Sequence, residues 1–439
     1  MSTDPGKLNG FPKPLWAWLA RHPPPGPFRS HTWRSPLRGP WLTSVFALVL
    51  LVGLPVVTVT GLLSYVAYAP QLGTALPTDV GWLHLPIFDW PTRPVWLYRL
   101  NQGLHVSLGI LLVPVVLAKL WSVIPKLFSW PPARSVAQVV ERLSLALLVG
   151  SILFEIVTGV LNIQYDYVLG LDFYTAHYYG AWVFIAAFLV HVTLKLPIMV
   201  SSLRSRSLRK ELRTPLAETR PEPIDIHGLV ATDPAPATIS RRGLLALVAG
   251  GSLAVTAVSL GASLSDNLRG TALLSPRGQS GGDGPNGFPV NKTASTAGIR
   301  ATDVGPSWRL TLTGAGGPMV LDRAALLAMP QRTAHLPIAC VEGWSTTQTW
   351  TGVRLADLAA ASGVPDPSSA RVTSLQIGGL FSEAALTGGQ VRDADALLAL
   401  KVNGVDLSLD HGFPARIIVP ALPGVHNTKW VRAIEFRGA

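Results

Sequence analysis

ACVEGWS, residues 339–345, contains the only cysteine of this 439-residue chain and lies where a predicted strand passes into a loop. A single thiol cannot form an intramolecular disulfide, and it cannot build a structural zinc site alone. Three roles remain for Cys340: a small buried side chain, a nucleophile, or the one protein sulfur that binds a cofactor metal. Motifs elsewhere in the chain distinguish among these three roles.

Three further motifs follow Cys340 in order: TSLQIGG at residues 373–379, HGFPARIIVP at 411–420 and GVHNTKW at 424–430. The ordered set resembles the molybdopterin domain of the sulfite oxidase family, which includes a bacterial periplasmic branch of methionine-sulfoxide reductases. The resemblance covers roughly residues 288–437. Short alternating stretches mix there with helical patches, which indicates an α+β fold.

The resemblance implies a molybdopterin-dependent oxidoreductase in which Cys340 ligates molybdenum at the catalytic centre. A pyranopterin carries a phosphate, and cationic donors such as Arg416 and Lys429 suit phosphate oxygens. The residues expected to hold the pterin are Asn291, Thr373, Ser374, His411, Arg416, Asn427, Thr428 and Lys429.

The substrate stays open, because the chain departs from both branches of the family. Residues 291–295 do not match the asparagine and aromatic cluster of the sulfoxide reductases. Residues 341–343 stand where the sulfite oxidases have an arginine-rich sequence.

Composition indicates that the rest of the chain is a membrane protein. Hydrophobic residues make up 48% and charged residues 14% of the chain, and the mean hydropathy is +0.35, unlike an ordinary soluble domain. Five apolar runs are each long enough for a bilayer core of about 30 Å. They predict spans at 41–69, 99–125, 139–163, 174–200 and 243–263.

The placement of Lys and Arg predicts the orientation of the spans. Basic residues gather before the first span, between the second and third, and between the fourth and fifth. Because basic connections stay cytoplasmic, we expect a cytoplasmic amino terminus and an extracytoplasmic carboxy-terminal domain in a bacterial cell membrane. The basic arms explain much of the net charge of +11, and no basic face interleaved with aromatics supports nucleic-acid binding.

The fifth predicted span begins with SRRGLL at residues 240–245. This start resembles a twin-arginine export signal, here internal and uncleaved. Export of an already folded domain suits a cofactor that is inserted in the cytoplasm. The alternative is an ordinary span anchored by Arg241 and Arg242.

Histidines inside the predicted spans are candidate functional residues. His177 and His191 are 14 residues apart on the fourth span, hence about 21 Å apart along the axis and nearly on one face. His105 lies near the outer end of the second span. Together with VTGV at residues 157–160, these histidines resemble the four-span cytochrome b subunit of formate dehydrogenases and nickel hydrogenases, over residues 41 to about 200. The alternative is that each is a core histidine hydrogen-bonded to a neighbouring helix.

The cytochrome b resemblance implies an outer haem b held by His105 and His177. It implies an inner haem on His191 and on a histidine at the start of the first span. That span contains no histidine, and His31 is ten residues upstream. The inner haem is therefore absent, or His31 folds back, or another ligand substitutes, so we expect one haem and leave a second open.

The predicted organisation is multi-domain: an all-α four-span bundle, an anchoring fifth span and an α+β molybdopterin domain. The expected segments are a cytoplasmic arm at 1–40, the cytochrome b-like domain at 41–203, a cytoplasmic linker at 204–242, the fifth span at 243–263, a flexible tether at 264–287 and the molybdopterin domain at 288–439.

Joined together, these parts predict an oxidoreductase that exchanges electrons between the quinone pool and an extracytoplasmic oxygen-atom-transfer substrate through haem b. The leading prediction is reduction of a sulfoxide or N-oxide, either a small molecule or protein-bound. One alternative is a quinone-linked dehydrogenase of sulfite or a related small anion. Another is a haem-containing membrane scaffold whose carboxy-terminal domain has lost its cofactor. The expected partners are membrane lipid and quinone or quinol, and the oligomeric state stays open.

Overall fold

The computed structural model describes residues 18, 21–29, 32–72, 79–80, 83–84, 87–131, 136–161, 173–224, 228–264, 266–274, 282–378 and 382–438. The chain forms two compact units. The helical unit consists of Met1–Pro55, Gly109–Leu161 and Leu171–Val255, and the mixed unit of Val56–Leu108, Asn162–Gly170 and Thr256–Ala439. His31, parts of the predicted arm 1–40 and the middle of the predicted tether lie outside the described residues.

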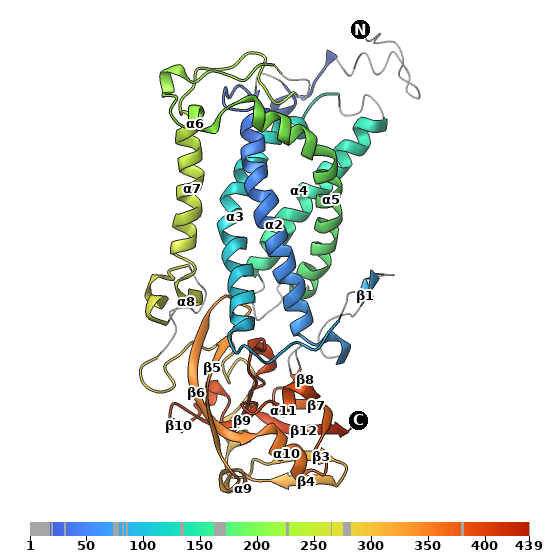
Figure 1. The fold of residues 1–439 in the computed structure, drawn as a ribbon, viewed down its shortest axis with the longest axis vertical. Coiled ribbons are helices and arrows are strands. Elements are labelled where there is room, and N and C mark those ends of the chain that lie inside the picture. The colour runs from blue at the N-terminus through green and yellow to red at the C-terminus, as the bar shows by residue number, and fades with distance from the viewer. Residues whose placement is uncertain are drawn as a thin grey trace. The chain divides into compact units, whose positions relative to one another are not determined.

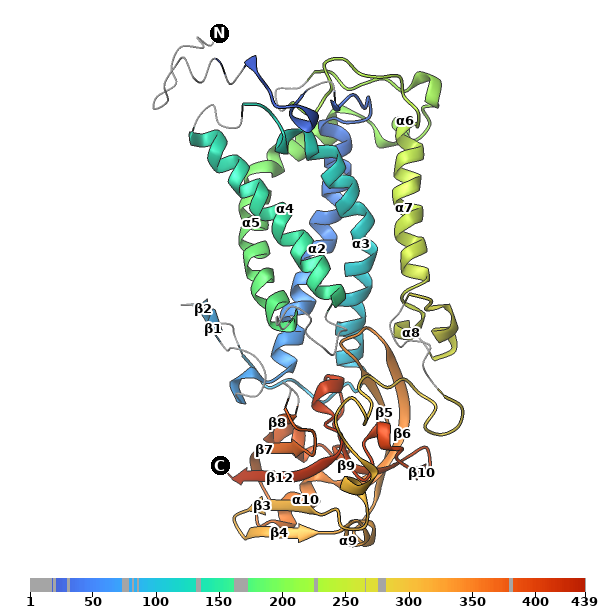
Figure 2. The same ribbon diagram turned by 180° about the vertical axis from the view of Figure 1, so that it is seen from behind.

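Four long helices correspond to the first four predicted spans. They are α2 (Pro40–Ala67), α3 (Leu97–Leu127), α4 (Val136–Leu161) and α5 (Phe173–Ser205). By length and composition, all four are apolar enough to cross a membrane. Large apolar side chains such as Val52, Leu143 and Leu189 are more than half exposed, as expected of a surface that lipid covers. Within the helical unit, α4 and α5 pack side by side (Figures 1 and 2).

The segment of the predicted fifth span begins with helix α7 (Arg241–Ala257). Its 17 residues are at the lower limit of about 17–25 for a transmembrane helix, so the fifth span stays a prediction. The shorter elements are α6 (Leu208–Glu211), α8 (Gly261–Leu264), η1 (Gly26–Phe28), η3 (Pro70–Leu72), η4 (Leu216–Glu218), η5 (Asp266–Thr271) and a two-stranded ladder of β1 (Asp79–Val80) and β2 (Leu83–His84).

The carboxy-terminal part of the mixed unit is α+β, as predicted. One sheet has the order β4-β3-β12-β7-β8 (Figure 2). In the other, the order is β10-β9-β6-β5, and β11 also pairs with β9. The strands are β3 (Leu310–Gly314), β4 (Gly317–Leu321), β5 (Arg332–Ala339), β6 (Ser345–Arg354), β7 (Pro367–Ser374), β8 (Glu383–Thr387), β9 (Leu397–Val402), β10 (Val405–Asp406), β11 (Arg416–Ile418) and β12 (Val431–Gly438). The helices are α9 (Arg323–Ala328), α10 (Leu355–Ala361), α11 (Gly388–Arg392), η6 (Ala301–Val304), η7 (Leu409–His411) and η8 (Gly424–His426).

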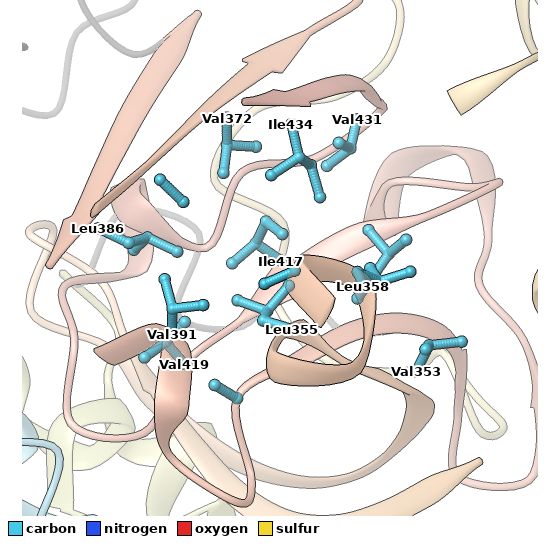
Figure 3. Packing of buried hydrophobic residues seen from close by; sticks show 14 of the residues in the cluster. Val353, Leu355, Leu358, Val372, Leu386, Val391, Ile417, Val419, Val431 and Ile434 are labelled. Atoms are coloured by element: carbon cyan, nitrogen blue, oxygen red, sulfur yellow. The ribbon is translucent and has the colours of Figure 1, made fainter. Parts of the chain in front are cut away.

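The core of this domain fixes the short strand β11. Figure 3 shows Ile417 of β11 among Leu355 and Leu358 of α10 and the β12 residue Ile434. Because side chains alternate along a strand, the neighbours of Ile417 face the other way. Ile418 lies in a second cluster with Trp350, and the guanidinium of Arg416 lies 5.2 Å from the Trp350 ring centroid. The side chain of Arg416 therefore points away from the main core and toward β6, the strand that follows the cysteine motif.

Candidate cofactor site

Cys340 directly follows β5 and is held in a tight turn. The backbone N–H of Cys340 donates to the carbonyl of Trp344 at 2.9 Å, and the N–H of Gly343 donates to the carbonyl of Cys340 at 3.1 Å. Gly343 has a φ of +94°, which favours glycine. The cysteine is 2% exposed, so its thiol is buried at a fixed position.

Five of the predicted site residues meet in one small pocket beside this turn: Asn291, Cys340, His411, Arg416 and Lys429. They come from four separate segments of the chain. The pocket is completed by Phe288, Pro289, Ile338, Trp344 and Gly424. Its volume is about 10 Å³, so side chains must move apart to admit a ligand larger than a water molecule.

The other four predicted residues do not line the pocket. Asn427 and Thr428 position strand β11: the Asn427 carbonyl accepts from Nη2 of Arg416 at 3.1 Å, and the Thr428 carbonyl accepts from the N–H of Ile417 at 2.8 Å. Ser374 donates its hydroxyl to the carbonyl of Lys429 at 2.8 Å. Thr373 lies in the β7 ladder. At least three of the four therefore contact the segments that carry the pocket cations.

Arg416 is a buried cation and Lys429 a partly buried one, and the described hydrogen bonds of both go to carbonyl oxygens. Arg416 donates to the carbonyls of His411 and Asn427, and Nζ of Lys429 to those of Lys292 and Asp410 at 2.8 Å each. Burial lowers the pKa of Arg416 to about 9. Burial, together with repulsion from Arg416, lowers the pKa of Lys429 well below its ordinary value. Two neighbouring cations, one buried and one partly buried, with no carboxylate among their described hydrogen-bond partners are costly, and a bound anion would offset part of that cost.

Two buried side-chain donors, one on Arg416 itself and one on Asn427, are also unsatisfied. Among the described residues, Nε of Arg416 and Nδ2 of Asn427 have no hydrogen-bond partner, although both are buried. Buried donors are nearly always paired in folded proteins. A phosphate-bearing pterin would supply acceptors, and Cys340 would supply the soft sulfur ligand that molybdenum needs. The residues present therefore fit a molybdenum–pterin group.

His411 is an uncharged member of the pocket at neutral pH. Burial, followed by repulsion from Arg416 and Lys429, lowers its pKa to about 3. Nε2 lies 2.9 Å from the carbonyl oxygen of Asn286, and the ring stacks on Phe288 with centroids 3.7 Å apart. The imidazole is thus fixed as a neutral hydrogen-bonding group.

Sequence reasoning missed five residues that line the pocket, and a signal existed for two of them. Trp344 and Gly424 both lie within the motifs already singled out. Gly424 allows a close approach to the cysteine segment, because a Cβ there would lie 3.0 Å from the carbonyl oxygen of Ala339. No motif pointed to Phe288, Pro289 or Ile338.

Comparison with known proteins agrees with this geometry. Residues 297–439 match the family described as oxidoreductase molybdopterin binding domain. This part of the chain is a molybdopterin-binding oxidoreductase domain. Its relatives include the uncharacterized oxidoreductase YuiH of Bacillus subtilis (strain 168), 33% identical over 135 residues, and a sulfite oxidase of Arabidopsis thaliana, 31% identical over 126 residues. These alignments cover 29% and 24% of the present chain, and 65% and 32% of the relatives. The chain thus spans less than two thirds of either relative.

The sulfane dehydrogenase SoxCD from Paracoccus pantotrophus is a similar solved structure, at 26% identity, a TM-score of 0.28 and coverage of 30% of this chain and 39% of that one. The family match confirms the carboxy-terminal half of the resemblance seen in the sequence. It lies entirely within residues 297–439, so the cytochrome b resemblance of residues 41 to about 200 stays a prediction.

His105 of α3 is oriented by α2 within the mixed unit. Its Nδ1 lies 3.0 Å from the carbonyl oxygen of Val57 and 3.3 Å from Oγ1 of Thr60. Gly61 makes room for the ring, since a Cβ there would lie 3.0 Å from Cε1 of His105.

His177 of α5 has the same arrangement with α4 within the helical unit. Its Nδ1 lies 3.0 Å from Oγ1 of Thr158 and 3.2 Å from a carboxylate oxygen of Glu155. A Cβ on Gly159 would lie 3.2 Å from its Cε1. In both cases a Val-Thr-Gly tripeptide on one helix faces the histidine of the next: residues 59–61 for His105 and residues 157–159 for His177. Only the second tripeptide is part of VTGV at residues 157–160, the motif of the cytochrome b resemblance.

His191 lies in a different environment. It lines a cavity of about 210 Å³ between helices of the helical unit, together with Lys119, Glu141 and Lys195. Among the residues described around this cavity, His191 is the only histidine. The first-span ligand that an inner haem would need is therefore not found in the described lining.

Arg241 and Arg242, the pair of the predicted export signal, differ in burial. Arg241 is 2% exposed, forms an ion pair with Glu211 at 3.2 Å and donates to the carbonyl of Arg220 at 2.8 Å. Arg242 is exposed. Arg241 thus has a structural role in the folded helical unit.

Proposed function

We propose that the protein is a membrane-bound molybdenum oxidoreductase that takes electrons from a quinol through haem b and reduces an extracytoplasmic sulfoxide or N-oxide. The observation that carries this proposal is the pocket in which Cys340 meets the buried Arg416 and the partly buried Lys429. A cofactor-free scaffold would gain nothing from placing two cations beside a lone thiol. This geometry favours the enzyme over the scaffold.

Each pocket residue has a distinct proposed role. Cys340 would bind the metal, and Arg416 and Lys429 would neutralise the pterin phosphate. The neutral His411, whose Nε2–H donates to the carbonyl of Asn286, would have Nδ1 left to accept a hydrogen bond from the pterin ring without adding charge. The molybdenum–pterin group supplies two-electron oxygen-atom transfer when bound. Tight packing of Phe288 against His411 would keep water from the site.

The lining of the pocket favours a neutral substrate. Apart from the cations assigned to the pterin, the side chains near Cys340 include Phe288, Pro289, Ile338 and Trp344. An anion such as sulfite would need a further positive group to offset its desolvation. Oxidation of sulfite is the second candidate, because relatives of this domain include sulfite oxidases.

The span histidines support the haem part of the proposal. In both His105 and His177, Nδ1 faces oxygen atoms of the neighbouring helix. Such contacts commonly orient a metal-binding histidine so that Nε2 is the ligand. We further propose that the amino terminus lies in the cytoplasm. The carboxy-terminal domain would be exported through the twin-arginine-like start of α7.

Metal and turnover analysis of the purified full-length protein tests the proposal. We expect one molybdenum and one haem b per chain, and oxidation of a reduced quinol analogue upon addition of methionine sulfoxide or trimethylamine N-oxide. Sulfite-dependent reduction of an artificial acceptor, with no sulfoxide or N-oxide turnover, would favour the second candidate. Protein that carries haem but neither molybdenum nor pterin would contradict both enzyme proposals.

A further inference from the structure

The mixed unit includes residues 56–108 as well as the molybdopterin-binding domain. Within this unit, the connection between α2 and α3 contacts the domain directly. Trp90 is 5% exposed, and its indole N–H donates to the carbonyl of Ala421 at 2.8 Å. Arg93 forms ion pairs with Asp393 at 3.0 Å and Asp395 at 2.6 Å. The connection is therefore anchored at one apolar and one charged point.

One face of α3 lies against the loop that follows Cys340. Nε2 of Gln102 donates to the carbonyl of Val341 at 3.1 Å. A Cβ on Gly343 would lie 2.9 Å from Cγ1 of Val106, so the glycine permits this close approach. Nη1 of Arg99 donates to Oγ1 of Thr347 at 3.3 Å. Positions 99, 102 and 106 recur at helical spacing, which makes this a continuous helix face.

Apolar and aromatic side chains extend the contact. Val66 and Ala67 of α2 and Tyr98 of α3 belong to the same buried cluster as the strands of the domain. The ring of Tyr68 lies edge-on to His426, with centroids 5.4 Å apart. Ion pairs with a half-exposed member, such as those of Arg93, contribute little to stability. The buried aromatic residues therefore supply most of the attachment.

We infer that the carboxy-terminal half of α2, the amino-terminal half of α3 and residues 87–96 form a fixed docking platform for the molybdopterin-binding domain. We infer further that electrons enter the domain at the Gln102–Val341 contact. Val341 directly follows the proposed molybdenum ligand, and Gln102 is one helical turn from the proposed haem ligand His105. This second part rests on the proposed function, whereas the docking does not.

A fixed platform gives a short route for the electrons. Oxidation of a quinol to a quinone releases two electrons and two protons, and reduction of a sulfoxide to a sulfide and water takes up two of each. Both electrons of each turnover would cross from α3 to the Cys340 loop without movement of the domain on its tether. A domain free on a tether would instead have to diffuse back to the membrane for each electron.

Cleavage of the tether tests the docking. A protease recognition sequence inserted after Gly282, where the glycine faces open space, would allow the domain to be cut from α7 in membranes. We expect the cut domain to sediment with wild-type membranes and to be released when Trp90→Ala and Arg93→Glu are combined. Arg300→Glu is the matched charge reversal, because the described ion pair of Arg300 is a local one with Asp303. Release of the cut domain from wild-type membranes would overturn the platform.

Reoxidation of the haem tests the electron entry. After reduction by quinol, we expect Gln102→Leu to slow reoxidation by sulfoxide about tenfold, since small displacements at a reacting contact have large effects on rate. Turnover driven by a dye that reduces the domain directly should stay at the wild-type level. Gln376→Leu is the control, because Gln376 bonds within its own loop. Wild-type haem reoxidation in Gln102→Leu would overturn the entry point, and a protein without haem would contradict the proposed function while leaving the tether result valid.

Discussion

The pocket around Cys340 and the sites around the span histidines are built in opposite ways. The pocket draws its side chains from segments far apart in the sequence, which two sheets bring together. Each histidine site needs only two consecutive helices and a Val-Thr-Gly tripeptide. The difference shows why the pocket has a recognisable family signature, whereas a three-residue motif in a helix hairpin does not.

The two regions also differ in charge. The pocket holds one buried and one partly buried cation together with unsatisfied donors, so an anionic ligand would suit it. The histidine sites offer oxygen atoms to Nδ1, so they fix the direction of a ring. The first region is therefore tested best by removing charge or ligand, and the second by removing an orienting hydrogen bond.

Cys340→Ser should have the largest effect. A serine oxygen is a harder ligand than a thiolate and suits a soft metal site poorly. We expect turnover to fall by more than the roughly 100-fold that loss of an outer-shell partner costs, while the haem absorbance stays intact. Ser345→Ala, at the residue that directly follows the turn, is the control for local packing. Near-wild-type turnover in Cys340→Ser would remove the cysteine from the metal site.

Much of this site is predictable from the sequence because it is encoded in ordered motifs. The motifs alone identify Cys340, His411, Arg416 and Lys429, and sequence patterns also predict the α+β fold and the first four spans. Thr373 and Ser374 are not separable from the pocket residues by motif alone. Their positions depend on the pairing of β7 with β12. A local sequence pattern does not predict pairing between strands so far apart in the chain.

Other features depend on contacts that no sequence pattern reveals. The role of Gln102 requires α3 to lie on the loop after Cys340, and that loop is more than 200 residues away in the sequence. Arg241 and Arg242 look equivalent in the sequence, but only Arg241 is buried against Glu211. The Val-Thr-Gly tripeptide of residues 59–61 can be recognised as part of a histidine site only because the structure places the imidazole of His105 beside it.

Arg416→Ala should have the second-largest effect, and it tests whether the pocket needs its positive charge. Removing the guanidinium takes away a buried cation and a donor suited to phosphate. We expect the affinity of the protein for the molybdenum–pterin group to fall by about 10- to 100-fold, measured as the molybdenum and pterin content of the purified protein. Arg416→Lys should restore part of the loss, because it keeps the charge but not the forked geometry. Unchanged pterin content in Arg416→Ala would show that the phosphate binds elsewhere.

Thr158→Val should have a smaller effect, on the orientation of His177 alone. The change removes a hydroxyl 3.0 Å from Nδ1 and leaves the carboxylate of Glu155 in place. We expect haem to be retained with an affinity about tenfold lower and with a shifted absorbance maximum. Thr193→Val is the matched control, since its hydroxyl bonds only to the carbonyl of Leu189 in the described contacts. If Thr158→Val and Thr193→Val behave alike, the tripeptide has no role in haem binding.

His191→Ala is expected to have the smallest effect, and it separates the two kinds of span histidine. His177 faces a Thr-Gly pair, whereas His191 lines an open cavity in which no second imidazole is described. A haem on His191 would need a second histidine at this cavity, so we expect one haem per chain in both wild type and His191→Ala, and loss of that haem in His177→Ala. A pyridine haemochrome assay measures both. Two haems in the wild type, with one lost in His191→Ala, would mean that a ligand reaches the cavity from outside its described lining. His31 would then be the first residue to substitute, because it is the histidine nearest to the start of α2 beyond the described residues.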